Sequence, residues 1–521
     1  MKETALFKNT VVIGLGTLLS RISGLLREIL ISSFFGATWV TDAFLIAYTI
    51  PNLLRRLFAE GALSTSVVPV FSRYFVASSS SKEEPQNFVS SVFSGFTFIV
   101  TLVCVLGMVF SSLIVHSVAF GFRSEPAKLF FTTRSTQIMF PFLLLISWSA
   151  LLMGFLNTLH IFSWSAVAPF FFNLGTIVSI LAFRHIFGPY ALAFGVVLGG
   201  LWQFLFQIPP LRQKGFTLRI RWRCFRDPGF QEVLRLMLPV TFALAVSQVN
   251  TLVDRIVASL CREGAVSALY FSDRLMEFPL GVFGVALSVA ILPSLSQNVW
   301  MENMEEWQGT LWQGIRWVLF FMLPAVVFLM VFPLPLVNLV YRRGMFDHLA
   351  AEMTAAALFF YAPGLLFFAL NHLLTRAFYS LRDTRTPVKI GLLSVLLNVV
   401  LDLWLVRFLD FRGVALATSF SAFFQFTLLV YFLRQKTKVE VFLRSPGDWL
   451  WKVGVQLGVF ILGCVCVARA TTRSSLWGFA LGALFLWVLY LVLPFLLRMD
   501  ERKVLLAMLG DVRRVFRQLG G

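Results

Sequence analysis

The sequence predicts an all-α protein that crosses a membrane many times. Hydrophobic residues make up 58% of its 521 residues and charged residues only 13%, whereas about a quarter of the residues in a soluble domain are charged. Apolar runs of roughly 20 residues, enough to cross about 30 Å of hydrocarbon, recur from Asn9 almost to Leu497. Composition and run length together exclude a soluble fold.

Taken in order along the chain, the apolar runs between polar breaks predict about fourteen transmembrane helices. The first eight are expected near residues 9–33, 39–71, 88–117, 129–158, 162–184, 189–210, 231–260 and 265–298. The last six are expected near residues 314–340, 351–379, 387–406, 413–433, 449–468 and 475–497. An even number of spans places both termini on the same side of the membrane.

The distribution of lysine and arginine predicts which side that is. These residues gather in the loops 211–230, 382–389 and 434–444 and in the tail 498–521, whereas the opposite loops hold at most two each, such as Arg342 and Arg343. Because cytoplasmic loops carry the excess of positive charge, we expect cytoplasmic termini. The same rule accounts for the net charge of +18 without a nucleic-acid partner.

An internal repeat has a period of about 224 residues. ALSTSVVPVFS at 62–72 aligns with ALSVAILPSLS at 286–296, and GPYALA at 188–193 aligns with GVALA at 413–417. A period of six spans preserves orientation, so we expect two parallel six-helix lobes, a common build of alternating-access transporters. The expected domains are an N-terminal lobe over 1–210, a basic cytoplasmic linker over 211–230, a C-terminal lobe over 231–434, two extra helices over 449–497 and a basic cytoplasmic tail over 498–521.

Charged residues stand inside three of the predicted spans, although a charge at a helix centre costs about 2.5–3.5 kcal/mol. They are Arg21, Arg27, Asp42, Arg55, Arg56, Glu60, Asp273, Arg274 and Glu277. Such residues face a wet cavity or one another and usually mark a functional site. The structural alternative is that arginines near helix ends reach the interface, and that Arg27 with Glu28 and Arg274 with Glu277 are ion pairs.

The excess of arginine points to an anionic ligand. Arginine stays protonated, and its planar fork binds phosphate through two parallel hydrogen bonds. Arginines from three spans therefore predict a diphosphate site, whereas an exporter of cations would favour carboxylates. Pro51 and Pro279 lie near these charges and are expected to break their helices, as in transporter cavities. The sequence contains no G-x-x-x-x-G-K-[ST] loop, so we do not expect ATP hydrolysis.

A second polar cluster is expected in the C-terminal lobe. Asp254, Asn398, Asp402 and Thr418 all offer oxygen atoms, which alkali and alkaline-earth cations prefer as ligands. Asn398 and Asp402 are four residues apart and share one helix face. The sequence is equally compatible with a structural role, in which Asp254 pairs with the adjacent Arg255 and Asn398 satisfies a helix contact.

Three stretches resemble the lipid II flippases of bacterial peptidoglycan synthesis, the MurJ (MviN) family of the MATE-like superfamily. They are SRISGLLRE at 20–28, TDAFLIAYTIPNLLRRLFAEGALS at 41–64 and YFSDRLMEFPLGVFGVALSVAILPSLS at 270–296. The resemblance covers essentially the whole chain. It implies that Arg21, Arg27, Arg55 and Arg274 bind the diphosphate and head group, while Asp42, Arg56, Glu60, Asp273 and Glu277 tune the cavity. It also implies that residues 449–497 border a groove for the polyprenyl tail.

In this family some members hold a sodium ion, which the resemblance assigns to Asp254, Asn398, Asp402, Val414 and Thr418. The implied function is a transporter rather than an enzyme. It would carry undecaprenyl-diphosphate-linked disaccharide-pentapeptide from the inner to the outer leaflet of the bacterial cytoplasmic membrane by alternating access. We expect a monomer among membrane lipids, with no required cofactor and with the membrane potential or sodium as energy source. The alternatives are a flippase for another lipid-linked oligosaccharide and a cation-coupled drug exporter.

Overall fold

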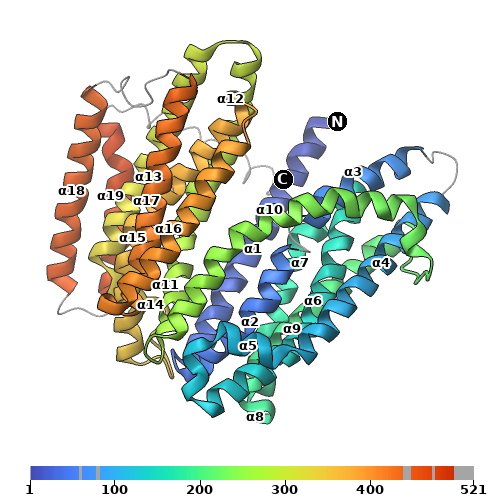
Figure 1. The fold of residues 1–521 in the computed structure, drawn as a ribbon. Helices are drawn as coiled ribbons and strands as arrows, with labels where there is room; N and C mark the ends of the chain where they lie inside the picture. Colours follow the sequence, from blue (N-terminus) through green and yellow to red (C-terminus); the bar gives the residue numbers. More distant parts are fainter. Residues whose placement is uncertain (1, 58–61, 78–82, 438–446, 472–475, 498–521) are drawn as a thin grey trace. The chain divides into compact units, whose positions relative to one another are not determined.

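The computed structural model describes residues 2–57, 62–77, 83–437, 447–471 and 476–497. These residues are helical almost throughout and contain no β-strand (Figure 1), so the prediction of an all-α fold is confirmed. Among them, ten helical stretches are long and apolar enough to cross a membrane. The charged helices α1 (Lys2–Phe35), α2 (Trp39–Arg55) and α10 (Pro228–Ser259) are not among the ten. The total of fourteen spans therefore stays a prediction.

The chain forms two compact units. Unit 1 comprises Met1–Ser267 and Arg343–Ala350, and unit 2 comprises Ala268–Arg342 and Ala351–Gly521. Helix α10 thus packs with unit 1, although the sequence repeat assigned it to the C-terminal lobe. Packing defines the units, whereas the repeat defines the lobes, so the division into two six-helix lobes stays a prediction.

Unit 1 is built around helix α6 (Pro126–Thr158), which packs against six other helices of the unit. Besides α1, α2, α6 and α10, it contains α3 (Ala62–Ala77), α4 (Glu83–Val109), α5 (Ser111–Val118), α7 (Phe162–Val178), α8 (Arg184–Phe187) and α9 (Ala191–Gln213). Short 3-10 or π turns occur at Phe120–Ser124, Ser179–Phe183, Gly188–Tyr190 and Cys224–Arg226.

Glycine allows α7 and α9 to pack as a tight hairpin. A Cβ atom on Gly175 of α7 would lie 2.6 Å from the Cα of Gly199 of α9, closer than any real side chain allows. Gly188, in the connection between the two helices, has a φ of +55°, which glycine adopts without strain. The hairpin therefore places the backbones of α7 and α9 in direct contact.

Unit 2 begins within α11 (Ala265–Pro279). It continues with a π-helix at Leu280–Val285 and then α12 (Ala286–Trp300), α13 (Met304–Val331), α14 (Pro333–Val340), α15 (His348–Ser380), α16 (Arg385–Leu409), α17 (Phe411–Thr437), α18 (Gly447–Thr471) and α19 (Leu476–Leu496). Helices α3 and α12, which contain the first pair of repeated segments, both continue through the aligned prolines Pro69 and Pro293.

The two prolines beside the intramembrane charges have different effects. Helix α11 ends at Pro279 and passes into the π-helix Leu280–Val285, which confirms the expected irregularity. Pro51, in contrast, lies inside α2, which continues to Arg55, so the break expected there is wrong at that residue. A proline removes one backbone hydrogen bond, and the helix can continue when its other hydrogen bonds persist.

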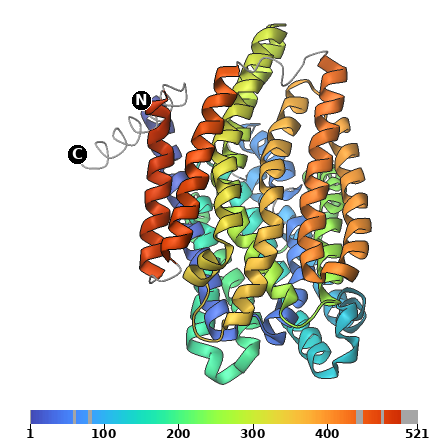
Figure 2. The ribbon, with the colours of Figure 1, turned by 90° about the vertical axis from the view of Figure 1, so that its left-hand side faces the viewer.

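Two hydrogen bonds attach α18 and α19 to α13 within unit 2. The buried Tyr490 of α19 donates its hydroxyl to the Phe320 carbonyl at 2.7 Å, and Gln456 of α18 donates to the Tyr490 carbonyl at 2.9 Å. Trp449 of α18 packs edge-on against Trp312 of α13, with ring centroids 5.7 Å apart. Figure 2 shows α18 and α19, in red, beside α13. The two helices after the repeat are therefore an integral part of unit 2.

Candidate substrate-binding site

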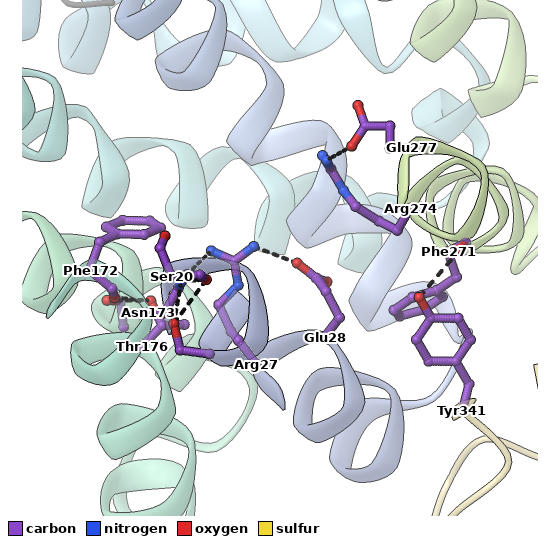
Figure 3. A network of polar contacts seen from close by, with 12 residues as sticks. Ser20, Arg27, Glu28, Phe172, Asn173, Thr176, Phe271, Arg274, Glu277 and Tyr341 are labelled. Carbon is purple, nitrogen blue, oxygen red and sulfur yellow. Dashed lines mark hydrogen bonds and ion pairs between the residues drawn. The ribbon is translucent and has the colours of Figure 1, made fainter. Parts of the chain in front are cut away.

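Arg27 is held between α1 and α7 by a polar network (Figure 3). Its guanidinium donates one hydrogen bond to Asn173 Oδ1 at 3.1 Å and another to the adjacent Glu28, and it lies 5.6 Å from the centre of the Phe172 ring. The side chain of Arg27 is 19% exposed and that of Glu28 only 3%. An ion pair predicted as the structural alternative is thus present, and it is largely buried.

Asn173 joins this arginine to the backbone of α1. Its amide nitrogen donates to the Ser20 carbonyl at 3.0 Å and to Ser23 Oγ at 2.9 Å. Ser23 in turn donates to the Ser20 carbonyl at 2.9 Å. Because one amide side chain orients Arg27 and binds α1, the position of the guanidinium depends on the packing of α1 against α7.

The other arginines of unit 1 that were predicted to line the site have different surroundings. Arg21 is exposed on α1. Arg55 is half-buried at the end of α2 and donates to Asn52 Oδ1 at 3.0 Å. Arg56 donates to Gln248 Oε1 of α10 at 3.3 Å. These side chains belong to the same unit as Arg27, whereas Glu60 lies outside the described residues.

Asp42 is fully buried and binds the connection between α10 and α11. One carboxylate oxygen accepts from the Gly264 backbone N–H at 2.7 Å, and the other accepts from the N–H and hydroxyl of Ser267 at 2.8 and 2.6 Å. The ammonium of Lys128, at the start of α6, lies 4.0 Å away. Since helix N-termini favour negative charge, this carboxylate stabilises the first turn of α11.

In unit 2, Arg274 forms an ion pair with Glu277 one helical turn further along α11 (Figure 3). Its guanidinium also lies 4.9 Å from the centre of the Tyr270 ring. The side chain of Arg274 is 32% exposed and that of Glu277 is 45% exposed, and Asp273 is half-buried. This second predicted pair is therefore present in a more open setting than the Arg27–Glu28 pair.

The predicted diphosphate ligands are divided between the units, because Arg21, Arg27 and Arg55 belong to unit 1 and Arg274 to unit 2. Their convergence on a single ligand stays a prediction. Within each unit taken by itself, the structure pairs one of these arginines with a carboxylate: Arg27 with Glu28 in unit 1 and Arg274 with Glu277 in unit 2. A carboxylate next to each arginine holds the guanidinium in a defined orientation.

Four of the five predicted sodium ligands lie on neighbouring helices of unit 2. Asn398 and Asp402 are buried on α16, and Thr418 on α17 donates its hydroxyl to the Val414 carbonyl at 2.9 Å. Asp254 belongs to unit 1, where its carboxylate accepts from Asn250 at 3.4 Å. Carboxylate, amide, hydroxyl and carbonyl oxygens match the preferences of a hard cation, so the residue types fit sodium.

Several side chains that contact the predicted charged residues from other helices were not singled out from the sequence. They include Lys128, Asn173 and Gln248, the partners of Asp42, Arg27 and Arg56. Asn173 interrupts the apolar run FFFNLG of the fifth predicted span, which was a usable signal. Lys128 and Gln248 gave less indication, since polar residues near helix ends or beside other polar residues are common.

Ten helical stretches able to cross a membrane, together with ion-paired arginines on α1 and α11, are typical of a multi-pass membrane transporter. Solved structures support this class. The chain is similar to a lipid II flippase MurJ structure in an inward closed conformation, with a TM-score of 0.79 and 25% identity over 94% of this chain and 99% of that one. It also shares its fold with an inward-facing multidrug resistance MATE family transporter of the MOP superfamily, at a TM-score of 0.67 and 16% identity over 80% and 94% of the two chains.

Sequence comparison defines the family. The chain is 37% identical to a probable lipid II flippase MurJ of Vibrio cholerae, over 83% of this chain and 85% of the relative. It is 31% identical to the probable lipid II flippase MurJ of Treponema pallidum, over 91% and 89% of the two chains. The family model described as lipid II flippase MurJ matches residues 31–490. The chain therefore belongs to the MurJ family, and it is a multi-pass inner membrane protein.

Proposed function

We propose that this chain is a flippase that moves lipid II from the inner to the outer leaflet of the cytoplasmic membrane by alternating access. The observation that carries the proposal is the family match over residues 31–490, which includes the helices that hold Arg55 and Arg274. The buried Arg27 network on α1 and α7 supports a diphosphate as the recognised group. The role is transport rather than catalysis.

The carboxylates beside the arginines act as internal substitutes for the substrate. A guanidinium left alone in a buried site is costly, and Glu28 compensates Arg27 when no substrate is bound. A diphosphate offers the same guanidinium oxygen acceptors in bidentate geometry, so substrate binding exchanges one anion for another. This exchange keeps the free-energy cost of moving the diphosphate into the buried site low, and it allows the substrate to be released again. Arg274 and Glu277 form the corresponding pair in unit 2.

Asn173 fixes the geometry of the exchange. Because it accepts one hydrogen bond from Arg27 while donating to Ser20 and Ser23, the guanidinium keeps its orientation when Glu28 gives way to the substrate. Arg21 and Arg55 add positive charge on α1 and α2. The polyprenyl tail stays in lipid, beside α18 and α19.

The energetics of the cycle follow from the charge of the cargo. Outward movement of a negatively charged diphosphate across an inside-negative membrane is favourable by about 2.3 kcal/mol per charge per 100 mV. A sodium ion held by Asp254, Asn398, Asp402, Val414 and Thr418 would supply a further input for returning the empty carrier. Loss of lipid II transport when the potential is collapsed is the expected result.

The direct test replaces the flippase of a depletion strain with this chain and measures lipid II in the outer leaflet with an impermeant probe. Restored labelling is expected, and labelling that stays at the depleted level would contradict the proposal. Arg27→Lys keeps the charge but loses the planar fork, so it should abolish labelling. Arg342→Lys, at an exposed arginine of a connecting segment, is the matched control and should leave labelling unchanged.

A further inference from the structure

The segment 214–227 between α9 and α10 is bound along α4 as an ordered strap. Gln86 of α4 exchanges two hydrogen bonds with the backbone of Thr217, at 2.6 and 2.9 Å. About two helical turns further along α4, Ser94 donates to the Arg219 carbonyl at 3.1 Å and accepts from the Arg221 N–H at 2.8 Å. The strap therefore follows α4 in a fixed register.

Buried side chains anchor the strap on its inner side. Phe216 is 3% exposed and packs edge-on against Phe71, with ring centroids 5.8 Å apart. Cys224 is 1% exposed, and burial raises the pKa of its thiol. Phe216 and Cys224 are therefore the inward-facing residues of the strap, and residues 219–223 between them are all exposed.

The outward side combines positive charge with large apolar groups. Trp222 is 81% exposed, Ile220 61% and Phe225 47%. Six basic residues are exposed in or next to the strap, and within the described chain none of them forms an ion pair with a carboxylate. They are Arg212, Lys214, Arg219, Arg221, Arg223 and Arg226. Alternating basic and apolar side chains are typical of segments that lie in a membrane interface.

The place of the strap on α4 brings these charges close to hydrocarbon. The Trp222 ring packs against Phe98, with ring centroids 5.4 Å apart. Phe98 lies ten residues past Phe88, roughly 15 Å along the helix axis, inside the apolar part of a helix that is long enough to span the membrane. Arginines on both sides of Trp222 must then extend toward the headgroups, where lipid phosphates are the available anions.

We propose that the strap is a binding surface for anionic phospholipids. The basic side chains bind the headgroup phosphates while Trp222, Ile220 and Phe225 enter the upper acyl region. Membrane topology alone requires only the positive charges, and it does not require exposed aromatic and aliphatic side chains held in register along a helix. The lipids belong to the cytoplasmic leaflet in the orientation given above.

The proposal is tested on the full chain in nanodiscs of equimolar phosphatidylglycerol and phosphatidylcholine. A photoreactive benzoylphenylalanine substituted for Thr217, which is exposed in the strap, reports the neighbouring lipids, and mass spectrometry gives the ratio of the two lipid adducts. The expected ratio favours phosphatidylglycerol, by up to ~5-fold for each arginine in contact at low salt. It should fall as sodium chloride is raised.

Variants separate the charged part of the surface from the apolar part. Arg219→Gln, Arg221→Gln and Arg223→Gln combined should bring the adduct ratio down to that of the bulk lipid. Trp222→Ser should lower the yield of both adducts while leaving the ratio above one.

The matched control removes the same number of charges elsewhere, at three exposed arginines outside the strap: Arg342→Gln in a connecting segment, Arg407→Gln in the last turn of α16 and Arg412→Gln at the start of α17. Its adduct ratio should equal that of the parent chain. A bulk ratio in the parent chain, or an equal fall in the control, would overturn the proposal. Both readouts are independent of lipid II transport, so the flippase proposal is tested separately.

Discussion

Replacing Asp42 should destabilise the chain strongly, because its carboxylate satisfies three donors in a buried site. Asp42→Ala removes the acceptor for the Gly264 N–H and for the N–H and hydroxyl of Ser267. It also leaves the buried ammonium of Lys128 with only the exposed carboxylate of Glu125, 3.8 Å away, in place of the buried one at 4.0 Å. We therefore expect the largest loss of stability from this substitution among those described below.

The magnitude follows from the contacts. Breaking a buried ion pair by removing one partner costs about 3–5 kcal/mol, which sets the expectation for Asp42→Ala. Asp42→Asn keeps one carbonyl oxygen and loses the charge, so about 2–3 kcal/mol is expected from a lost charged hydrogen bond. Ser267→Ala removes only the hydroxyl donor and should cost about 1 kcal/mol.

A double substitution isolates the charge. At 4.0 Å, two unit charges in an effective dielectric of about 20 interact by up to about 4 kcal/mol. Lys128→Met alone loses this attraction, and in the Asp42→Asn background it should cost much less. The measurement is the midpoint of thermal unfolding of the purified chain in detergent at one scan rate, since such unfolding is often irreversible.

The expected order of stability loss is Asp42→Ala, then Asp42→Asn, then Ser267→Ala, and this order tests whether the Asp42 carboxylate is the common acceptor. A midpoint for Ser267→Ala as low as that for Asp42→Ala would refute the role of the carboxylate as the common acceptor. So would additive effects of Lys128→Met and Asp42→Asn, because additivity means that the two side chains do not interact.

Three further predictions concern other contacts. Asn173→Leu should lower head-group binding about as much as removing a charged hydrogen bond to Arg27, roughly 10-fold or more, with little change in expression; unchanged lipid II binding in a pull-down would contradict it. Tyr490→Phe should lower the thermal midpoint by an amount equivalent to about 1–2 kcal/mol, because the hydroxyl joins α19 to α13; an unchanged midpoint would contradict this. The pKa of Asp383 is about 2: burial raises it, but Lys436 and Thr386 lower it more. Lys436→Met should therefore cost about 0.5–1 kcal/mol at pH 7, the surface value, and progressively less as the pH falls below about 4, because the stabilisation is lost as the carboxyl is protonated; an equal cost at pH 7 and pH 3 would refute the pairing.

Much of the helical architecture could be predicted from hydrophobic run length. The run predicted at 129–158 is α6 (Pro126–Thr158), and the run at 351–379 is α15 (His348–Ser380). The run at 39–71 was too long for one helix, and the structure describes α2 and α3 there. The positions of helix ends depend on local polar residues and turns. The change to a π-helix after Pro279 depends on backbone hydrogen bonds, which the length of an apolar run does not predict.

The ion pair Arg274–Glu277 could be predicted because residues three positions apart share a helix face. The pair Arg27–Glu28 was offered from adjacency alone, and the structure confirms it. The partners that lie far along the chain could not be predicted. Asp42 was expected to tune a cavity, and the structure adds that it binds the start of α11 through residues more than two hundred positions away. Nothing in local sequence specifies such a contact, because it depends on how α2 packs against the connection after α10.

By itself the sequence determined that this is a helical membrane protein with arginines in its spans, because hydrophobicity and charge act on each helix separately. The family motifs then indicated the cargo. Only the tertiary structure decided that Asn173 orients Arg27, that α10 packs with unit 1, and that segment 214–227 lies along α4 with Trp222 outward. These features come from packing between helices, where a few hydrogen bonds and buried rings select one arrangement among many of similar composition.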